Sequence, residues 1–132
     1  MIIADASALL SIILKEDDAA IFEGALISAG GAVMSPVNYW ETLARSSAEF
    51  AERGQKAAKD VMTSLNVDVV TLSAADAESA AEAFRRYGKG AGGKLNLGDC
   101  FAYALAAREG DGLLYKGDDF PTTDVKSALD RA

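Results

Sequence analysis

Short runs of apolar residues, each about as long as a β-strand, recur along the chain and alternate with longer segments of helical periodicity. The first run ends at an aspartate, and the third is rich in valine and threonine, which favour extended structure. Turn residues or helix-start residues bound each run, as expected for buried strands. The pattern predicts strands at residues 1–4, 32–34, 68–72 and 113–115, with a short fifth strand at residues 123–125.

Segments with apolar residues three and four positions apart separate these strands and predict helices. Ser35 followed by Pro36 is a strong helix start, with serine as the N-cap and proline at the first helical position. The pair Asp17-Asp18 can cap another helix, and Ser73 with Asp76 resembles a capping box. The predicted helices cover residues 7–14, 19–29, 37–52, 56–65, 74–87 and 98–109, and a final short helix follows residue 125.

This alternation of strands with helices or helix pairs predicts an α/β fold. We expect one domain over residues 1–132, built as a three-layer α/β/α sandwich with a central, mainly parallel sheet of four to five strands. In sheets of this type, ligands bind beyond the carboxyl ends of the strands. The polar residues that follow the strands are therefore the candidates for chemistry.

Composition narrows the chemistry that the chain can support. The 132 residues include 20 acidic and 13 basic side chains, for a net charge of −7, which argues against nucleic-acid binding through bulk positive charge. There is no histidine, which excludes Ser-His-Asp catalysis, Cys-His catalysis and histidine-ligated zinc. The single cysteine excludes an internal disulfide framework. Catalysis has to depend on carboxylates, lysine, tyrosine, hydroxyls, the thiol or a metal.

The start of the chain carries no targeting pattern. It lacks a basic segment followed by a cleavable apolar segment, and its longest apolar run, residues 8–14, is too short to span a bilayer. We therefore expect a cytoplasmic protein without a membrane anchor.

Acidic residues follow the predicted strands. Asp5 comes directly after the first strand, and the pair Asp118-Asp119 follows the strand at residues 113–115. Asp99 lies in the first turn of the helix at residues 98–109. Glu41 lies inside a helix, about a turn and a half from its start, and its side chain can point back toward the same strand ends.

Four carboxylates from distant segments would repel one another strongly if no cation offset their charge. Two divalent cations about 3.5–4 Å apart would offset it, hold a scissile phosphodiester and lower the pKa of a bound water. Mg²⁺ or Mn²⁺ suits ligands that are all oxygen. Structural alternatives remain: Asp99 can favour the helix dipole, Glu41 can be solvated, and Asp118 and Asp119 can be turn residues.

Other residues at these positions are expected to be structural. Ser7 is predicted to cap the first helix, with a hydrogen bond to a metal-bound oxygen as the alternative. Cys100 is expected to be a buried, inert thiol. Tyr39, Trp40 and Phe101 are interpreted as core or interface residues rather than as platforms for base stacking.

In order and spacing, these segments resemble a PIN domain, in particular a VapC-type toxin of a bacterial toxin–antitoxin pair. The resemblance covers essentially the whole chain. Any one motif is weak, and the ordered set is specific. The matching stretches are residues 3–9, 35–41, 87–90, 95–104, 113–120 and 123–125.

The resemblance implies a Mg²⁺- or Mn²⁺-dependent endoribonuclease that hydrolyses RNA phosphodiester bonds with a metal-activated water. It implies that Asp5 and Asp99 are the most direct metal ligands, with Glu41 and the acid after the fourth strand completing the cluster. Asp119, which precedes a phenylalanine as in the family, is favoured over Asp118. A VapB-like antitoxin and a homodimer are the implied partners, and an arginine of the antitoxin fits an acidic groove.

One loop departs from the family pattern. Relatives often carry basic residues after Gly90, whereas this chain has Ala-Gly-Gly at residues 91–93. Less positive charge should weaken phosphate binding. Lys89, Lys94 and Lys116 remain as candidate phosphate contacts, or as ordinary solvated lysines.

Other protein classes fit less well. A phosphatase of the haloacid dehalogenase type needs a second acid two residues after the first, where this chain has Ser7. A receiver-like domain needs an acidic pair after the first strand, and Asp5 stands alone. The stronger alternative is a catalytically silent PIN-like protein with a binding or regulatory role, which would be expected to have lost at least one of the four acids.

Overall fold

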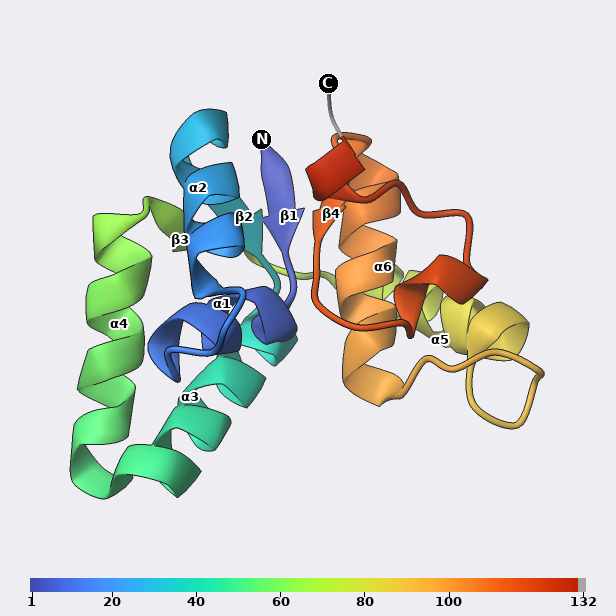
Figure 1. Cartoon of the computed structure of the whole chain (residues 1–132). Coiled ribbons are helices and arrows are strands. Elements are labelled where there is room, and N and C mark those ends of the chain that lie inside the picture. Colours follow the sequence, from blue (N-terminus) through green and yellow to red (C-terminus); the bar gives the residue numbers. More distant parts are fainter. Residues whose placement is uncertain (131–132) are drawn as a thin grey trace.

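The computed structural model describes residues 1–130, in which a parallel four-stranded sheet lies between layers of helices (Figure 1). The strand order is β3-β2-β1-β4, so β1 pairs with both β2 and β4 at the centre of the sheet. The α/β sandwich predicted from the sequence is confirmed. The strands are β1 (Ile2–Ala4), β2 (Ala32–Met34), β3 (Val67–Val69) and β4 (Leu113–Leu114).

Helices connect each strand to the next one along the chain, because parallel strands need a crossover connection. The six long predicted helices all form, and their ends differ from the prediction by at most two residues. The α-helices are α1 (Ala6–Ile13), α2 (Ala19–Ala29), α3 (Pro36–Phe50), α4 (Gly54–Ser64), α5 (Ala74–Tyr87) and α6 (Leu97–Glu109). Three short 3₁₀ segments are η1 (Ala51–Arg53), η2 (Phe120–Thr122) and η3 (Ala128–Asp130).

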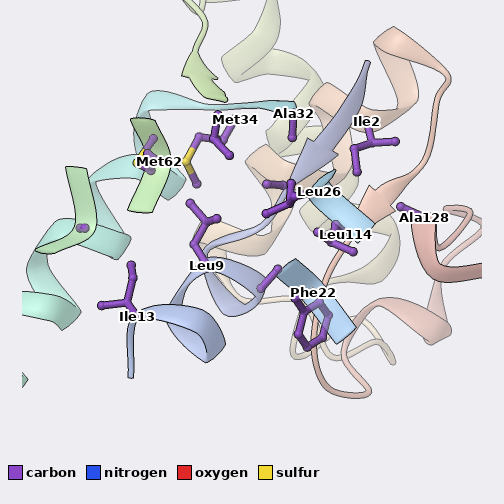
Figure 2. Packing of buried hydrophobic residues seen from close by; sticks show 14 residues of the cluster. Ile2, Leu9, Ile13, Phe22, Leu26, Ala32, Met34, Met62, Leu114 and Ala128 are labelled. Carbon is purple, nitrogen blue, oxygen red and sulfur yellow. The ribbon is translucent and has the colours of Figure 1, made fainter. Parts of the chain in front are cut away.

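The central strand divides the core into two clusters, because successive side chains of a strand point to opposite faces. Ile2 and Ala4 face the cluster made with α1, α2 and α4, which Figure 2 shows with Leu9 and Leu26 at its centre. Ile3 faces the other cluster, made with α5 and α6. Helices thus cover both faces of the sheet. Burial of each large apolar side chain contributes roughly 1.5–3 kcal/mol to the stability of the fold.

The carboxyl ends of the strands meet at one edge of the sheet. Asp5 directly follows β1, and Ser35 directly follows β2 and caps α3 through its hydroxyl. The backbone N–H of Asp5 donates to the carbonyl of Leu114 in β4 over 2.9 Å. Residues that follow β1, β2 and β4 are thereby brought to the same edge.

The predicted fifth strand at residues 123–125 is wrong. These residues follow η2 as irregular backbone, and a single bridge joins Leu113 to Ser127. The hydroxyl of Thr123 donates to the carbonyl of Phe120 over 2.7 Å, which closes the turn. Local hydroxyl bonds of this kind compete with strand pairing.

Two capping predictions have different outcomes. The capping box of Ser73 and Asp76 is confirmed by reciprocal bonds at the start of α5. Asp18 occupies the N-cap position of α2 without a side-chain cap, and its carboxylate instead accepts a bond from Ser11. The prediction that Asp18 caps this helix through its side chain is therefore wrong.

No helix within residues 1–130 is both long enough and apolar enough to cross a membrane.

Candidate active site

Asp5 is a buried carboxylate at the end of β1. Its Oδ2 accepts a bond from the backbone N–H of Ser7 at 3.1 Å and another from the Ser7 hydroxyl at 2.6 Å. The same hydroxyl accepts from the backbone N–H of Lys116, just after β4, at 3.0 Å. Burial raises the pKa of Asp5, and the charge of Asp119 adds to that rise against the lowering by the Ser7 bonds.

These contacts correct the predicted role of Ser7. The N-cap of α1 is Asp5, whose side chain accepts the first free N–H of the helix. Ser7 links the end of β1 to the segment after β4 and holds one oxygen of Asp5 in place.

Glu41 lies on the second turn of α3, where Asn38 orients it. The side-chain amide of the fully buried Asn38 donates to Glu41 Oε1 at 2.8 Å and to the carbonyl of Gly98 at 3.0 Å. A Cβ atom at Gly98 would lie 2.4 Å from Glu41 Oε1, so only glycine lets α6 approach this carboxylate. Partial burial raises the pKa of Glu41, the Asn38 bond lowers it, and the charge of Asp5 raises it further.

Asp99 is held at the first turn of α6 by a capping box with Asn96. The Asn96 side chain accepts from the N–H of Asp99 at 2.8 Å, and Asp99 Oδ2 accepts from the N–H of Asn96 at 3.0 Å. Burial raises the pKa of Asp99 to about 7, although the Asn96 bond lowers it, and the charges of Asp5 and Asp119 add to the rise. Asp99 therefore stabilises the start of α6, and it also lies close enough to Asp5 and Asp119 for their charges to raise its pKa.

Asp119, and not Asp118, lies among these acids. Asp119 acts on the pKa of both Asp5 and Asp99, and on Asp99 also through a side-chain hydrogen bond. The next residue, Phe120, is buried in the core and anchors the segment. Asp118 is exposed and pairs with Lys94 at 3.2 Å.

The four predicted acids thus share one electrostatic neighbourhood, made from the end of β1, the segment after β4, the second turn of α3 and the first turn of α6. Each of Asp5, Glu41 and Asp99 has a raised pKa, with burial as the largest cause. Among residues 1–130, the one cation that lowers the pKa of any of these three acids is Arg45, which acts on Glu41 from the next turn of α3. The described residues therefore leave the cluster with uncompensated negative charge.

The chemistry of this donor set fits a divalent cation. All four groups offer carboxylate oxygens, the ligands that Mg²⁺ and Mn²⁺ prefer, and their uncompensated charge favours a cation. Within residues 1–130, no group of three acidic or cysteine side chains is already arranged around one ion position. The residues therefore fit by donor type and charge, and a bound ion has to draw the carboxylates together.

Two of the three predicted phosphate-binding lysines are engaged with acids. Lys116 pairs with Glu16 at 3.1 Å and with Asp18 at 3.2 Å, and Lys94 pairs with Asp118. Lys89 is exposed. Lys116 thereby links the segment after β4 to the turn before α2. The sequence does not reveal this contact, because about a hundred residues separate Lys116 from the two acids.

The aromatic and thiol predictions also divide. Cys100 is buried, and burial raises the pKa of its thiol to about 11, as expected for an inert side chain. Tyr39 and Phe101 are half-buried against the core clusters. Trp40 is 67% exposed, so it is not a core residue, and an interface position stays a prediction for it.

Asn38 and Arg45 are the residues of this site that sequence reasoning missed. Each has a signal in hindsight, since they lie three residues before and four residues after Glu41 on the same helix. The contact of Asn38 with Gly98 has no such signal, because 60 positions separate them.

Proteins of known type resemble this chain in both sequence and structure. The PIN domain family model matches residues 2–126. Ribonuclease VapC of Mycolicibacterium smegmatis is 41% identical over 126 residues, which cover 93% of this chain and 96% of that protein. Ribonuclease VapC30 of Mycobacterium tuberculosis is 40% identical, over 93% of this chain and 95% of that protein.

A solved structure supports the fold. The crystal structure of Mycobacterium tuberculosis VapC20, described as a sarcin-ricin loop cleaving toxin, matches with a TM-score of 0.77 over 95% of this chain and 96% of that chain. Its sequence identity is 18%, so this likeness speaks for the architecture alone.

Proposed function

Because this chain belongs to the PIN domain family and is a ribonuclease of the VapC type, we propose that Asp5, Glu41, Asp99 and Asp119 form its metal-dependent active site. The observation that carries this proposal is the burial of the Asp5 and Asp99 side chains at one place, where burial and the charges within the cluster raise the pKa values of Asp5, Glu41 and Asp99. A protein gathers uncompensated carboxylates at functional sites far more readily than in a structural core.

Mg²⁺ or Mn²⁺ would be held mainly by Asp5 and Asp99, with Glu41 and Asp119 completing the site or holding a second ion. When bound, the cation lowers the pKa of a water and offsets charge on the scissile phosphate. Asp99 would hold the ion in its deprotonated form, because metal ligands act without their proton.

The surrounding residues position these carboxylates. Ser7 and the Lys116 backbone fix one oxygen of Asp5, and Asn38 fixes one oxygen of Glu41. Asn96 holds Asp99 through the capping box. Precise placement of such groups accounts for a large part of the rate in phosphoryl-transfer sites.

The substrate we propose is RNA in single-stranded or loop form. The names of the curated relatives support RNA as the substrate class, since they are ribonucleases. The net charge of −7 and the engagement of Lys94 and Lys116 argue that little affinity comes from phosphate contacts. An unpaired strand, whose bases and backbone can follow the protein surface, suits that situation better than a duplex.

The chain acts as the toxin of a toxin–antitoxin pair, and its antitoxin is proposed to be a small VapB-like protein. An arginine of that partner would offset the acidic cluster by charge-assisted hydrogen bonds. Co-purification from the native host should bring down a small protein with a basic segment. Failure to recover one under low-salt conditions would count against this partner.

We also propose that each chain is a single PIN domain, that two chains form a homodimer, and that the protein is cytoplasmic. Family membership supports the dimer and the location, and sedimentation analysis of the purified protein tests the dimer. The silent alternative is disfavoured, because all four acids are present and share one site.

The product ends test the reaction itself. Attack by water on phosphorus gives linear ends, whereas attack by the neighbouring 2′-hydroxyl gives a 2′,3′-cyclic phosphate. We therefore expect fragments of purified RNA with linear phosphate or hydroxyl ends, formed only when Mg²⁺ or Mn²⁺ is present. Cyclic phosphate ends would contradict hydrolysis by water at this site.

A further inference from the structure

Two large apolar side chains are strongly exposed beside the acidic cluster. Trp40 on α3 is 67% exposed, and Leu97 at the start of α6 is 70% exposed. Both line one open hollow of about 400 Å³, and Glu41 lines it too. The hollow therefore borders the Glu41 side of the acidic cluster.

The two helices build this hollow from their exposed faces. Val37 and Trp40 lie one turn apart on α3, and Leu97 and Phe101 lie one turn apart on α6. Gly98 lets α6 approach α3 closely, and the four apolar side chains line the hollow beside this contact. An indole has only two side-chain torsions, so it presents a large flat surface at a low cost in conformational entropy.

Charge explains what such a surface is for in this protein. The net charge is −7, and Lys94 and Lys116 are paired with acids, which leaves less positive charge for phosphate contacts. An RNA strand then has to gain affinity from contacts that do not depend on charge. Stacking of a base on an aromatic ring is such a contact, and it tolerates any base because every base has a π-face.

We propose that Trp40 is a stacking platform for one unpaired base of the RNA, next to the phosphate that is cut. Leu97 supports the base from α6. This inference rests on the proposed function, because it places the base beside Glu41. It also specifies the substrate class, since a base inside a duplex is not free to stack on Trp40.

Trp40 is the only tryptophan in the chain, so its fluorescence reports on this position alone. The first experiment titrates the metal-free protein, in chelator, with a single-stranded RNA of about 10 nucleotides. A strand with the same number of phosphates and no bases is the matched probe. We expect the base-containing strand to quench Trp40 and the abasic strand to leave its emission unchanged.

The second experiment measures cleavage of the same RNA with Mg²⁺ or Mn²⁺ by wild type, Trp40→Ala and Trp40→Phe. Stacking is worth about 1–3 kcal/mol per base, so Trp40→Ala should raise KM by roughly 5- to 150-fold. Loss of an interaction present before and during the reaction leaves kcat within about threefold. Trp40→Phe keeps a ring and should retain most of the affinity.

Ile27→Ala is the control for losing an exposed apolar side chain. Ile27 on α2 is as exposed as Trp40, at 67%, and does not line the hollow. Its KM should match that of wild type.

Three results would overturn the inference. One is equal quenching by the abasic strand, which would assign the effect to phosphates. Another is cleavage by Trp40→Ala with an unchanged KM. A third is Trp40 emission that shifts with protein concentration and not with RNA, which would make the surface a protein interface. If base-specific quenching occurs while wild type cleaves no RNA under any metal, the stacking inference holds and the proposed function fails.

Discussion

The side-chain amide of Asn38 donates one hydrogen bond to Glu41 and another to the carbonyl of Gly98, at 2.8 and 3.0 Å. A single buried amide therefore fixes both the position of an acidic side chain and the approach of the helix that carries Asp99. Its own oxygen accepts from the hydroxyl of Ser35 at 2.6 Å, so all its polar atoms are used. This arrangement makes Asn38 a positioning residue for the acidic cluster.

Asn38→Asp should disable the site while keeping the shape of the side chain. The new carboxylate has no N–H for Glu41 or Gly98 and repels Glu41. We expect a loss of about 1–3 kcal/mol in the free energy of unfolding and a fall of at least tenfold in kcat, on the order of what misplacement of a catalytic group causes. Urea denaturation and RNA cleavage by the folded fraction measure the two effects.

Thr42→Val is the matched control on the same helix. Thr42 is buried and its hydroxyl donates to the carbonyl of Asn38, without touching Glu41. Its kcat should stay close to that of wild type. If Asn38→Asp also cleaves normally once folded, Glu41 does not depend on the amide.

Gly98→Ala should displace the Glu41 carboxylate by steric contact, because the added Cβ would lie 2.4 Å from Oε1. The protein should still fold, since the atom in contact ends a side chain, and cleavage should fall by roughly 10- to 100-fold. Gly24→Ala is the control, because nothing lies within 4 Å of its Cβ and it lies inside α2. That variant should be more stable by about 0.5–1 kcal/mol and fully active. Equal activities of the two variants would argue against a tight contact at Gly98.

Asp118→Asn and Asp119→Asn should behave differently, although the two residues are adjacent. Asp119 acts on Asp5 and Asp99, whereas Asp118 is exposed at 84% of its side chain and pairs with Lys94. We expect Asp119→Asn to lose at least about tenfold in kcat/KM, consistent with removal of a charged group from a catalytic site. Asp118→Asn should stay within about threefold, as for a surface ion pair. Steady-state kinetics on one RNA decide the matter, and the reverse order would assign the fourth acid to Asp118.

The metal-free protein should lose stability as the pH rises from about 4 to about 7. Burial raises the pKa of Asp99 from its ordinary value of 3.8 to about 7. In this range the folded protein holds a proton that the unfolded chain has released, so the free energy of unfolding falls with increasing pH. The raised pKa values of Asp5 and Glu41 act in the same direction.

Urea denaturation in chelator at pH 5 and pH 8 measures this slope, and Asp99→Asn should flatten it. At pH 8 the variant should be more stable than wild type by about 1–2 kcal/mol, since an unpaired buried charge is removed. Saturating Mg²⁺ or Mn²⁺ should restore wild type by about 2.7 kcal/mol at 100 times the dissociation constant. If the free energy of unfolding in chelator rises with pH, the carboxylates of the cluster are not destabilising one another, and the prediction is wrong.

The sequence predicted the parts of this site that follow from chain order. Asp5 comes directly after a strand, and the carboxyl ends of parallel strands share an edge, so its meeting with the acid after β4 could be foreseen. Glu41 was predictable as a candidate because its helix begins at Ser35, directly after β2. These inferences need local pattern and sheet topology, and no contact between distant side chains.

The parts that were missed depend on how distant segments pack. Lys116 meets Glu16 and Asp18 across about a hundred residues, a pairing that no local pattern reveals. Tryptophan is usually a buried residue type, and its exposure at Trp40 depends on how α3 and α6 pack together. The false strand at residues 123–125 came from the extended preference of threonine and valine, which local hydroxyl bonds override.

Cleavage of RNA by wild type, Asp5→Asn and Asp99→Asn, with Mg²⁺ or Mn²⁺ and with excess chelator, tests the central claim most directly. Each substitution keeps the shape and an oxygen acceptor, so both variants should fold, as circular dichroism checks. We expect metal-dependent cleavage by wild type that chelator abolishes and added metal restores, with a loss of at least about 100-fold in either variant. Cleavage that survives the chelator, or equal cleavage by both variants and wild type, would contradict an active site built from these acids.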